Sequence, residues 1–396
     1  MKLFDPNGNM RGWPESAESE APGERFVELI ACGDTGPVRN LEAVVLEKGP
    51  DHVLNDVLKE LNSADFVFAN LEAPYSERGQ PMDKIPTFRL DPKAFSLITG
   101  GGINVVSLAN NHIFDYGLEA FDDTVKLLRA GHIAYFGAGR SAEEAIQPAV
   151  VQANGMKLAF LGFMDKDQVA FLQKQGSGAV PRMALRNIQD TVVKIRDHVD
   201  WIIISLHFGL EYTMYPAPRD VALCRKLIDS GVDIIVGHHP HYPQGVEKYR
   251  HGLIAYSLGN FIWDQKFVGH TASSYMLKIR MSKDRITSVR TIPFKMNSSY
   301  RLEKGRESDA LEEIELLSAV LQDPKKYSKK WYFVSRNFFL NAVKNLYSIS
   351  FGNDKRRQIL NWMRNVTSSR SLYTIGCFLL YIVSFRSFIY EVKKKL

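Results

Sequence analysis

Two almost wholly apolar segments limit the folds available to this 396-residue chain more than any other feature of its sequence. They are WIIISL (201–206) and VDIIV (232–236), and each follows a stretch with the apolar spacing of an amphipathic helix (187–198 and 219–231). Strands that are buried on both faces have continuous apolar runs instead of alternating ones, because helices cover the sheet on each side. The pattern therefore predicts an α/β domain.

The same succession of strand, loop and helix repeats from Arg25 onward. An Asn-Gly pair inside 149–163 predicts a hairpin, so the sheet is expected to be mixed rather than purely parallel. The other expected strands are 26–32, 65–70, 103–108, 133–137, 253–258, 274–280 and 286–294. The other expected helices in this part of the chain are 52–64, 92–99 and 117–131.

The ends of the chain differ in composition from its body. Residues 1–22 are polar and rich in Pro, Gly, Glu and Ser, which predicts a disordered lead-in. They contain no apolar stretch typical of a secretory signal, so a cytoplasmic protein is expected. The main domain is expected over 23–300, with a polar linker near 295–310. A basic, aromatic-rich helical region is expected over 301–396.

The positive charge of the chain is concentrated in its last part. Residues 323–396 hold 15 Lys and Arg against 3 Asp and Glu, whereas residues 1–322 have a net charge of −6. The basic region also contains 15 aromatic residues and an apolar run at 372–385, which is short for a membrane-spanning helix. These features favour attachment to an anionic membrane surface over nucleic-acid binding. The alternative is a set of helices that pack on the main domain.

Polar side chains of the kind that bind metals follow five of the expected strands. In open α/β sheets, functional sites form beyond the carboxyl ends of the strands, so these side chains are expected to meet. Taken singly, each has another explanation, such as a turn former or a core histidine, and only their joint placement predicts a metal site. They are Asp34, Glu72, Asn111 with His112, His207 with Glu211, and His239 with His241.

The segment VGHHPHYPQG (236–245) places three histidines within four positions. A mixture of imidazole and carboxylate ligands suits Mn, Fe or Zn better than Mg or Ca. We expect Glu72 to bridge two divalent cations about 4 Å apart, a spacing that lets the pair activate water. If the loop is extended, alternate residues point in opposite directions, so His239 and His241 are expected to supply one ligand to each cation.

Six short blocks of the chain, in order, resemble the signature blocks of the CapA family of capsule or poly-γ-glutamate synthesis proteins. That family belongs to the calcineurin-like metallophosphoesterase superfamily, and the resemblance covers residues 26 to about 294. It implies a four-layer α/β/β/α sandwich with mixed sheets, here followed by a C-terminal helical extension. The blocks are GDTG (33–36), NLE (70–72), NNHIFDYG (110–117), HFGLEY (207–212), GHHPH (237–241) and YSLGNF (256–261).

The resemblance also implies a role for each candidate residue. Asp34 and His241 would bind the first metal, and Asn111, His207 and His239 the second. His112 would act as general acid, with Asp115 orienting its ring. The residues expected to contact the substrate are Asn70, Glu211, His238 and Asn260.

The chain departs from the superfamily pattern at two positions. Thr35-Gly36 follows Asp34 where a histidine ligand is usual, and Glu72 replaces an aspartate, so the first metal site is expected to be weak. The expected function is metal-dependent hydrolysis of a phosphoester or related ester in capsule, poly-γ-glutamate or exopolysaccharide synthesis. The expected partners are an anionic polymer or phosphorylated substrate and a capsule-synthesis complex. The alternatives are a non-catalytic, metal-containing module that binds a polyanion, and an enzyme acting on γ-glutamyl amide bonds.

Overall fold

The computed structural model describes residues 2–5, 7–13, 23–174, 178–265, 269–305 and 307–349. The chain divides into two compact units, residues 1–319 and 320–396. The division falls later than the predicted boundary at 300, because β14 (Leu302–Lys304) pairs with the first unit's sheet and Ile314 of α9 (Glu307–Gln322) is buried in its core. The described part of the second unit consists of the end of α9 and of α10 (Pro324–Ile349).

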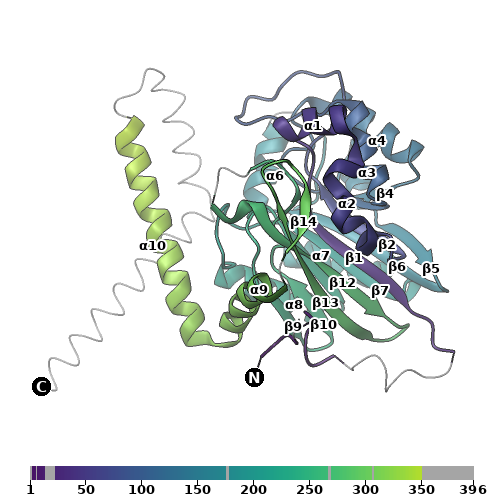
Figure 1. Ribbon diagram of the computed structural model, residues 1–396, viewed down its shortest axis with the longest axis vertical. Coiled ribbons are helices and arrows are strands. Elements are labelled where there is room, and N and C mark those ends of the chain that lie inside the picture. Colours follow the sequence, from purple (N-terminus) through teal and green to yellow (C-terminus); the bar gives the residue numbers. More distant parts are fainter. Residues whose placement is uncertain are drawn as a thin grey trace, which may run out of the picture. The chain divides into compact units, whose positions relative to one another are not determined.

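The first unit contains two mixed sheets with helices around them (Figure 1). The larger sheet has the strand order β14-β13-β12-β1-β2-β3-β4, and β11 pairs with β1 off this path. Strands β1 to β4 and β11 run parallel, while β12, β13 and β14 are antiparallel. The bounds are β1 Val27–Thr35, β2 Phe66–Leu71, β3 Val105–Ser107, β4 Ala134–Phe136, β11 Asn260–Ile262, β12 Ser273–Met281 and β13 Ile286–Met296.

The smaller sheet has six strands in the order β5-β6-β7-β8-β10-β9. Its four central strands are parallel, and the two edge strands are antiparallel to their neighbours. The predicted apolar segments form β7 and β8, and every residue of both strands is buried. The bounds are β5 Ala149–Ala153, β6 Met156–Met164, β7 Trp201–His207, β8 Ile234–His238, β9 Val246–Tyr249 and β10 Gly252–Ala255.

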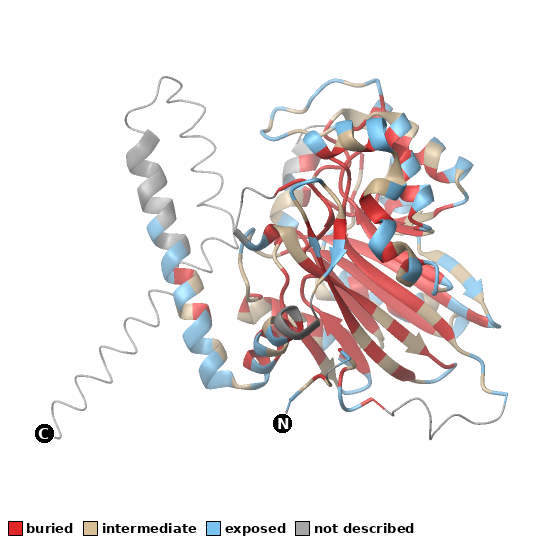
Figure 2. Cartoon of the chain, viewed as in Figure 1, coloured by how far each residue is buried: buried red, intermediate tan, exposed pale blue. Residues whose placement is uncertain are grey.

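Alternate residues of each central strand face two different cores. Leu29 and Ala31 of β1 belong to the cluster shared with Phe160 and Ile203 of the second sheet, so this core lies between the sheets. Ile30 belongs to the cluster formed with helices of the first half of the chain. Figure 2 shows the consequence, since the sheets are buried and the outer faces of the helices are exposed. The four-layer α/β/β/α sandwich is thus confirmed.

The helices enclose the two sheets. Helices α2 and α4 contribute Val53, Leu54 and Phe121 to the outer core of the larger sheet. On the smaller sheet, Ile228 of α8 packs against Gly252 of β10. The bounds are α1 Asn40–Lys48, α2 Pro50–Leu61, η1 Pro92–Phe95, α3 Ser96–Gly100, α4 Gly117–Ala130, α5 Ala142–Ala145, α6 Lys166–Lys174, α7 Leu185–Ile195, η2 Arg196–His198, α8 Pro218–Asp229 and η3 Gly269–Ala272.

Part of the expected disordered lead-in is folded. The backbone N–H of Met10 donates to the carbonyl of Val289 in β13, and Phe4 and Trp13 are buried. The carboxylate of Glu315 accepts hydrogen bonds from the N–H groups of residues 3 and 4. These apolar side chains have polar neighbours in the sequence. The polar composition of the segment therefore gave no sign that they are buried. Residues 14–22 lie outside the described residues.

Other differences concern short elements and the C-terminal region. The polar linker predicted near 295–310 contains β14 and the start of α9, and α1, β9 and β11 were not predicted. Within the described residues, no helix is both long and apolar enough to cross a membrane. The apolar run at 372–385 lies outside the described residues, and its predicted membrane contact stays a prediction.

Candidate metal centre

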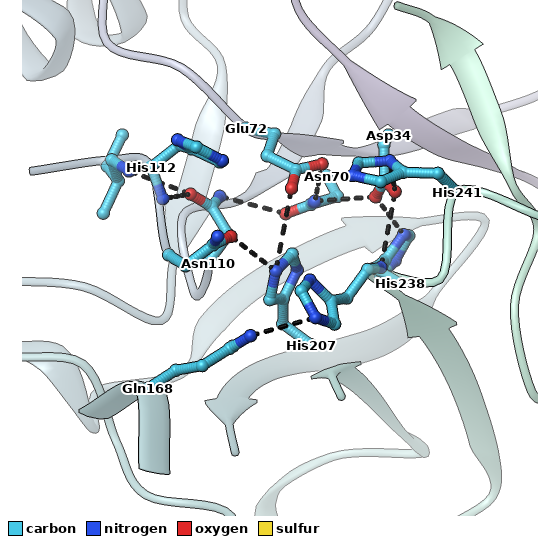
Figure 3. Close-up of polar contacts among 12 residues, drawn as sticks. Asp34, Asn70, Glu72, Asn110, His112, Gln168, His207, His238 and His241 are labelled. Carbon is cyan, nitrogen blue, oxygen red and sulfur yellow. Dashed lines mark hydrogen bonds and ion pairs between the residues drawn. The ribbon is translucent and has the colours of Figure 1, made fainter. Parts of the chain in front are cut away.

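The carboxyl ends of strands from both sheets bring their polar side chains together at one place (Figure 3). The larger sheet supplies Asp34 within β1, Glu72 directly after β2, and the loop that follows β3. The smaller sheet supplies His207, the last residue of β7, and the loop that follows β8. Because parallel strands point the same way, each strand delivers its terminal side chain to the same edge.

Two buried carboxylates form the centre of this cluster. The side-chain amide of Asn70 donates to Asp34 Oδ1 at 2.8 Å and to Glu72 Oε2 at 3.4 Å, so one amide holds both carboxylates. Asp34 and Glu72 are fully buried, and Glu72 Oε1 accepts no hydrogen bond from the described residues. A buried carboxylate oxygen without a hydrogen-bond donor is unfavourable unless a cation approaches it.

Histidines complete two groups that share Glu72. Glu72, His207 and His239 form one group, and Asp34, Glu72 and His241 form the other. Within each group the candidate ligand atoms all lie within 4.8 Å of one another. The side-chain oxygen of Asn111 lies 2.8 Å from His207 Nε2, which adds an oxygen donor beside the first of these groups. The expected ligands are therefore gathered together, with Glu72 common to both groups.

The loop after β8 reaches this arrangement differently from the sequence expectation. It is not extended, because His239 and His241 have φ angles of 97° and 57°. Positive φ is unfavourable for residues other than glycine, and such strain is concentrated at functional sites. The sharp turn through Pro240, and not the alternation of an extended chain, directs the two imidazoles to different groups.

Burial and neighbouring charges shift the pKa values of the ionisable groups in this cluster. Burial, followed by the negative charge of Asp34, raises the pKa of Glu72 well above its usual value. Burial works to raise the pKa of Asp34 as well, but hydrogen bonds from His238 and His241 outweigh it and lower that pKa. Burial, followed by the charge of His239, keeps the pKa of His207 well below normal, so its imidazole is in the neutral form that binds metals.

His112 stands beside the two groups with its own supporting residues. Its Nδ1 lies 2.7 Å from Asp115 Oδ2, and the buried Asp115 carboxylate also accepts from the N–H of Phe88. Lys84 Nζ lies 2.5 Å from Asp115 Oδ1, 2.5 Å from the carbonyl oxygen of Asn111 and 3.3 Å from His112 Nδ1. The Asp115 carboxylate thus contacts the His112 ring, and its orienting role stays a prediction.

The four residues expected to contact a substrate have different surroundings. Asn70 and His238 are fully buried, and His238 Nδ1 lies 3.3 Å from Asp34 Oδ1. Asn260 is buried too, with its side-chain oxygen 2.9 Å from His241 Nδ1. These three side chains therefore contact the candidate ligands themselves. Glu211 differs from them in being exposed, and its contact with a substrate stays a prediction.

Three further residues of the centre were not identified from the sequence. Lys84 lies in the long loop between β2 and η1, and Gln168 of α6 places its amide nitrogen 3.0 Å from His239 Nε2. Asn110 accepts from the backbone N–H of His112 and of Ile113, and donates to the carbonyl of Leu71. Only Asn110 had a sequence signal, because it adjoins Asn111 in the same block.

The residues present fit divalent cations. Each group offers carboxylate oxygen and imidazole nitrogen, the mixture that suits Mn, Fe and Zn. A shared cation would also relieve the two neighbouring carboxylates, whose charges otherwise oppose each other. The hydroxyl of Thr35 donates to the carbonyl of Gly33, and Gly36 has no side chain, so neither replaces the histidine that is absent after Asp34.

Comparison with known proteins identifies relatives. The family model described as "Bacterial capsule synthesis protein PGA_cap" matches residues 28–265. The capsule biosynthesis protein CapA of Bacillus anthracis is 32% identical over 265 residues, which is 64% of this chain and 64% of that protein. The PGA biosynthesis protein CapA of Bacillus subtilis is 29% identical over 278 residues, covering 69% of this chain and 73% of that protein. The chain thus spans less than two thirds of the Bacillus anthracis protein.

Solved structures give more distant similarities. One is the 5'-nucleotidase precursor from Thermus thermophilus, with a TM-score of 0.44, 13% identity, and coverage of 75% of this chain and 59% of that one. Another is the calcineurin-like phosphoesterase YfkN from Bacillus subtilis, with a TM-score of 0.41, 11% identity, and coverage of 78% and 98%.

Proposed function

The chain belongs to the bacterial capsule synthesis (PGA_cap) family, and on that premise we propose that it is a metal-dependent hydrolase acting in capsule or poly-γ-glutamate synthesis. Its substrate would be a phosphoester or related ester of an anionic polymer or a phosphorylated precursor. The observation that carries the proposal is the pair of ligand groups that share Glu72, with His112 beside them.

The proposed ligands divide between two divalent cations of the Mn, Fe or Zn type. Asp34 and His241 belong to one, His207 and His239 to the other, and Glu72 to both. Asn111 would add its side-chain oxygen to the His207 group. When bound, such a pair supplies Lewis-acid polarisation of an ester and lowers the pKa of water. The Asp34 group has fewer donors, which supports the expectation that it binds more weakly.

His112 is the proposed proton donor. Because Asp115 Oδ2 lies against His112 Nδ1, the proton on that nitrogen is held by the carboxylate and Nε2 is left to exchange a proton with a leaving group. Lys84 holds Asp115 and the Asn111 carbonyl, and it thereby fixes the loop that carries His112. His112 and Asp115 are thus proposed as the catalytic acid and its positioning residue.

Metal content and turnover, measured together, test this function. The full chain, purified without a histidine tag, is analysed by ICP-MS and assayed with bis-p-nitrophenyl phosphate, p-nitrophenyl phosphate and a γ-linked oligoglutamate. We expect two metals per chain and ester hydrolysis that His112→Asn reduces strongly and His251→Asn, at the half-exposed His251, leaves unchanged. Metal without any ester hydrolysis would contradict the proposal.

A second candidate, a metal-containing module that binds a polyanion without catalysis, is favoured by the lack of a histidine after Asp34. It predicts at most one metal per chain, binding of an anionic polymer, and no turnover in the same assays. Cleavage of the γ-linked oligoglutamate instead of the esters would support the third candidate, an amide hydrolase. The three outcomes exclude one another.

The basic C-terminal region is proposed to attach the protein to anionic membranes, near a polymer-synthesis complex. Helix α10 carries six Lys and Arg and no acidic residue, and Phe333 and Leu340 are exposed on it. Basic helices with aromatic side chains bind anionic interfaces. We expect the chain to float with phosphatidylserine vesicles but not with phosphatidylcholine vesicles. Charge reversal of Lys325, Lys326, Lys329 and Lys330 should abolish flotation. A wild-type protein that floats with neither type of vesicle would refute the attachment.

A further inference from the structure

Arg39 has a backbone conformation that is unfavourable for any residue with a side chain. Its φ and ψ angles are 59° and −132°, at the N-terminal boundary of α1. Glycine adopts such a conformation at little cost, whereas a residue with a Cβ is strained there. Such strain persists where the side chain has a use that a glycine could not serve. The position of the guanidinium suggests that use.

The Arg39 guanidinium lies on an aromatic wall beside the metal centre. It stacks over the ring of Phe88 at 4.9 Å, and its Nη1 donates to the carbonyl of Asp264 at 2.6 Å. The Phe88 ring in turn lies 4.8 Å from the ring of His112. Arg39 is therefore one ring away from the proposed proton donor, and it is exposed.

The same wall also reaches the other end of the centre. The ring of Trp263 lies 5.2 Å from Phe88 and stacks on His241 at 5.9 Å. Tyr212 borders the same end of the centre, since its ring lies 6.2 Å from that of His241. The exposed Arg39 guanidinium thus lies on Phe88, in a row of aromatic rings that borders the site at His112 and, through Trp263, at His241.

From this arrangement we propose that Arg39 is a substrate-binding residue. It holds an anionic group of the bound polymer, next to the group of that polymer that reacts. The inference rests on the proposed function, since it assumes that this centre receives an anionic substrate. A planar guanidinium matches carboxylate and phosphate in a bidentate manner, and stacking on Phe88 fixes its plane beforehand. A ligand whose anionic groups repeat along a chain can place one at the metal centre and the next at Arg39.

The ligand class is accordingly a polyanion with regularly spaced carboxylates or phosphates, and not an isolated neutral ester. The body of the protein is acidic overall, with a net charge of −6 over residues 1–322, so general attraction does not concentrate such a ligand there. A fixed cation at the border of the site is then needed to select it.

Arg250 offers a matched control. It is also an arginine with positive φ (53°), and it pairs with Asp229 at 2.9 Å with 65% of its side chain exposed. It lies in the turn between β9 and β10, shortly before Gly252, and β10 runs parallel to β8. Arg250 therefore lies near the amino ends of these parallel strands, whereas His238 lies at the carboxyl end of β8.

The test measures binding and stability of the full, metal-loaded chain, with a fluorescent γ-linked oligoglutamate and a polyphosphate of similar length as probes. For Arg39→Gly we expect affinity to fall by about ten- to hundredfold for one or both probes, the loss typical of a hydrogen bond to a charged group. Arg39→Lys should keep part of the affinity, and Arg250→Gly all of it. The thermal midpoint of Arg39→Gly should be unchanged or higher, because the strain is relieved.

A merely structural arginine would give the reverse result, with a lower midpoint for Arg39→Gly and unchanged probe binding. That result, equal losses in Arg250→Gly, or a wild-type chain that binds neither probe would overturn the inference. Which probe depends on Arg39 distinguishes carboxylate from phosphate chemistry. Turnover is not needed in these measurements, so Arg39-dependent binding without hydrolysis would refute the proposed hydrolase and leave the inference standing.

Discussion

Lys84 Nζ lies 2.5 Å from Asp115 Oδ1, and this largely buried ion pair holds the carboxylate that contacts the His112 ring. Removing one partner of a buried pair leaves an uncompensated charge, which typically costs about 3–5 kcal/mol. We therefore expect Lys84→Met and Asp115→Asn each to destabilise the chain strongly in urea unfolding. The double variant should be much more stable than the sum of the two losses predicts, and strictly additive losses would contradict a direct pair.

The same pair should affect catalysis through Asp115 more than through Lys84. Asp115 contacts the His112 ring directly, so Asp115→Asn is expected to lower kcat on the ester substrate by about 10²- to 10⁴-fold. Lys84→Met should lower it less, since the carboxylate and the Phe88 N–H remain in place. Steady-state assays at matched metal content distinguish this order from a uniform loss through unfolding.

Glu72→Gln should change stability in opposite directions with and without metal. Without a cation, the substitution removes a buried charge next to Asp34, and the free energy of unfolding should rise by about 1–3 kcal/mol in EDTA-treated protein. With Mn²⁺ or Zn²⁺ present, the wild type should gain stability as the ion binds, whereas the variant should not. Urea titrations of the four samples measure this, and a metal-free variant less stable than the metal-free wild type would contradict it.

His238→Gln should weaken one ligand group more than the other. His238 contacts Asp34 Oδ1, and Asp34 belongs only to the group with His241. Loss of a residue that orients a ligand typically lowers metal affinity about 10- to 100-fold. ICP-MS after dialysis should therefore show about one metal per chain instead of two. His251→Gln serves as the control, and loss of both metals, or of none, would count against this role.

Gly33→Ala should destabilise the fold next to the metal centre. A Cβ at Gly33 would lie 1.9 Å from the carbonyl oxygen of Gly259, so β1 and the residue before β11 could not keep their spacing. The expected cost is about 3 kcal/mol or more. At Gly305 the nearest atoms would be 3.6 Å away, and Gly305→Ala should change stability by no more than about 0.5 kcal/mol. Thermal melts in EDTA keep metal binding out of this comparison.

The sequence predicted the strand ends because two simple signals coincide there. Continuous apolar runs such as β7 identify a buried strand, and the first polar residue after the run, such as His207, is its carboxyl end. The ligand residues could thus be collected without knowing how the sheets pack. The two-sheet architecture, in contrast, came from the family resemblance, because apolar periodicity does not say which strands share a sheet.

Lys84 and Gln168 could not be found in this way. Lys84 lies in a long irregular loop, and Gln168 is one polar residue among several on α6. Both reach the centre only through tertiary packing, which has no periodic signature in the sequence. The buried Phe4 and Trp13 were missed for a related reason, since single apolar residues in a polar segment do not indicate where they pack.

Each ligand group draws its members from both sheets, and this has a consequence for how the protein matures. Glu72 comes from the larger sheet and His207 and His239 from the smaller one, while His241 joins Asp34 and Glu72 across the same boundary. A chain in which only one sheet has formed would present only some of the ligands of each group. Metal binding would therefore stabilise the packing of the two sheets against each other only when they are correctly docked. Removal of the metal would weaken this packing before it unfolded either sheet alone.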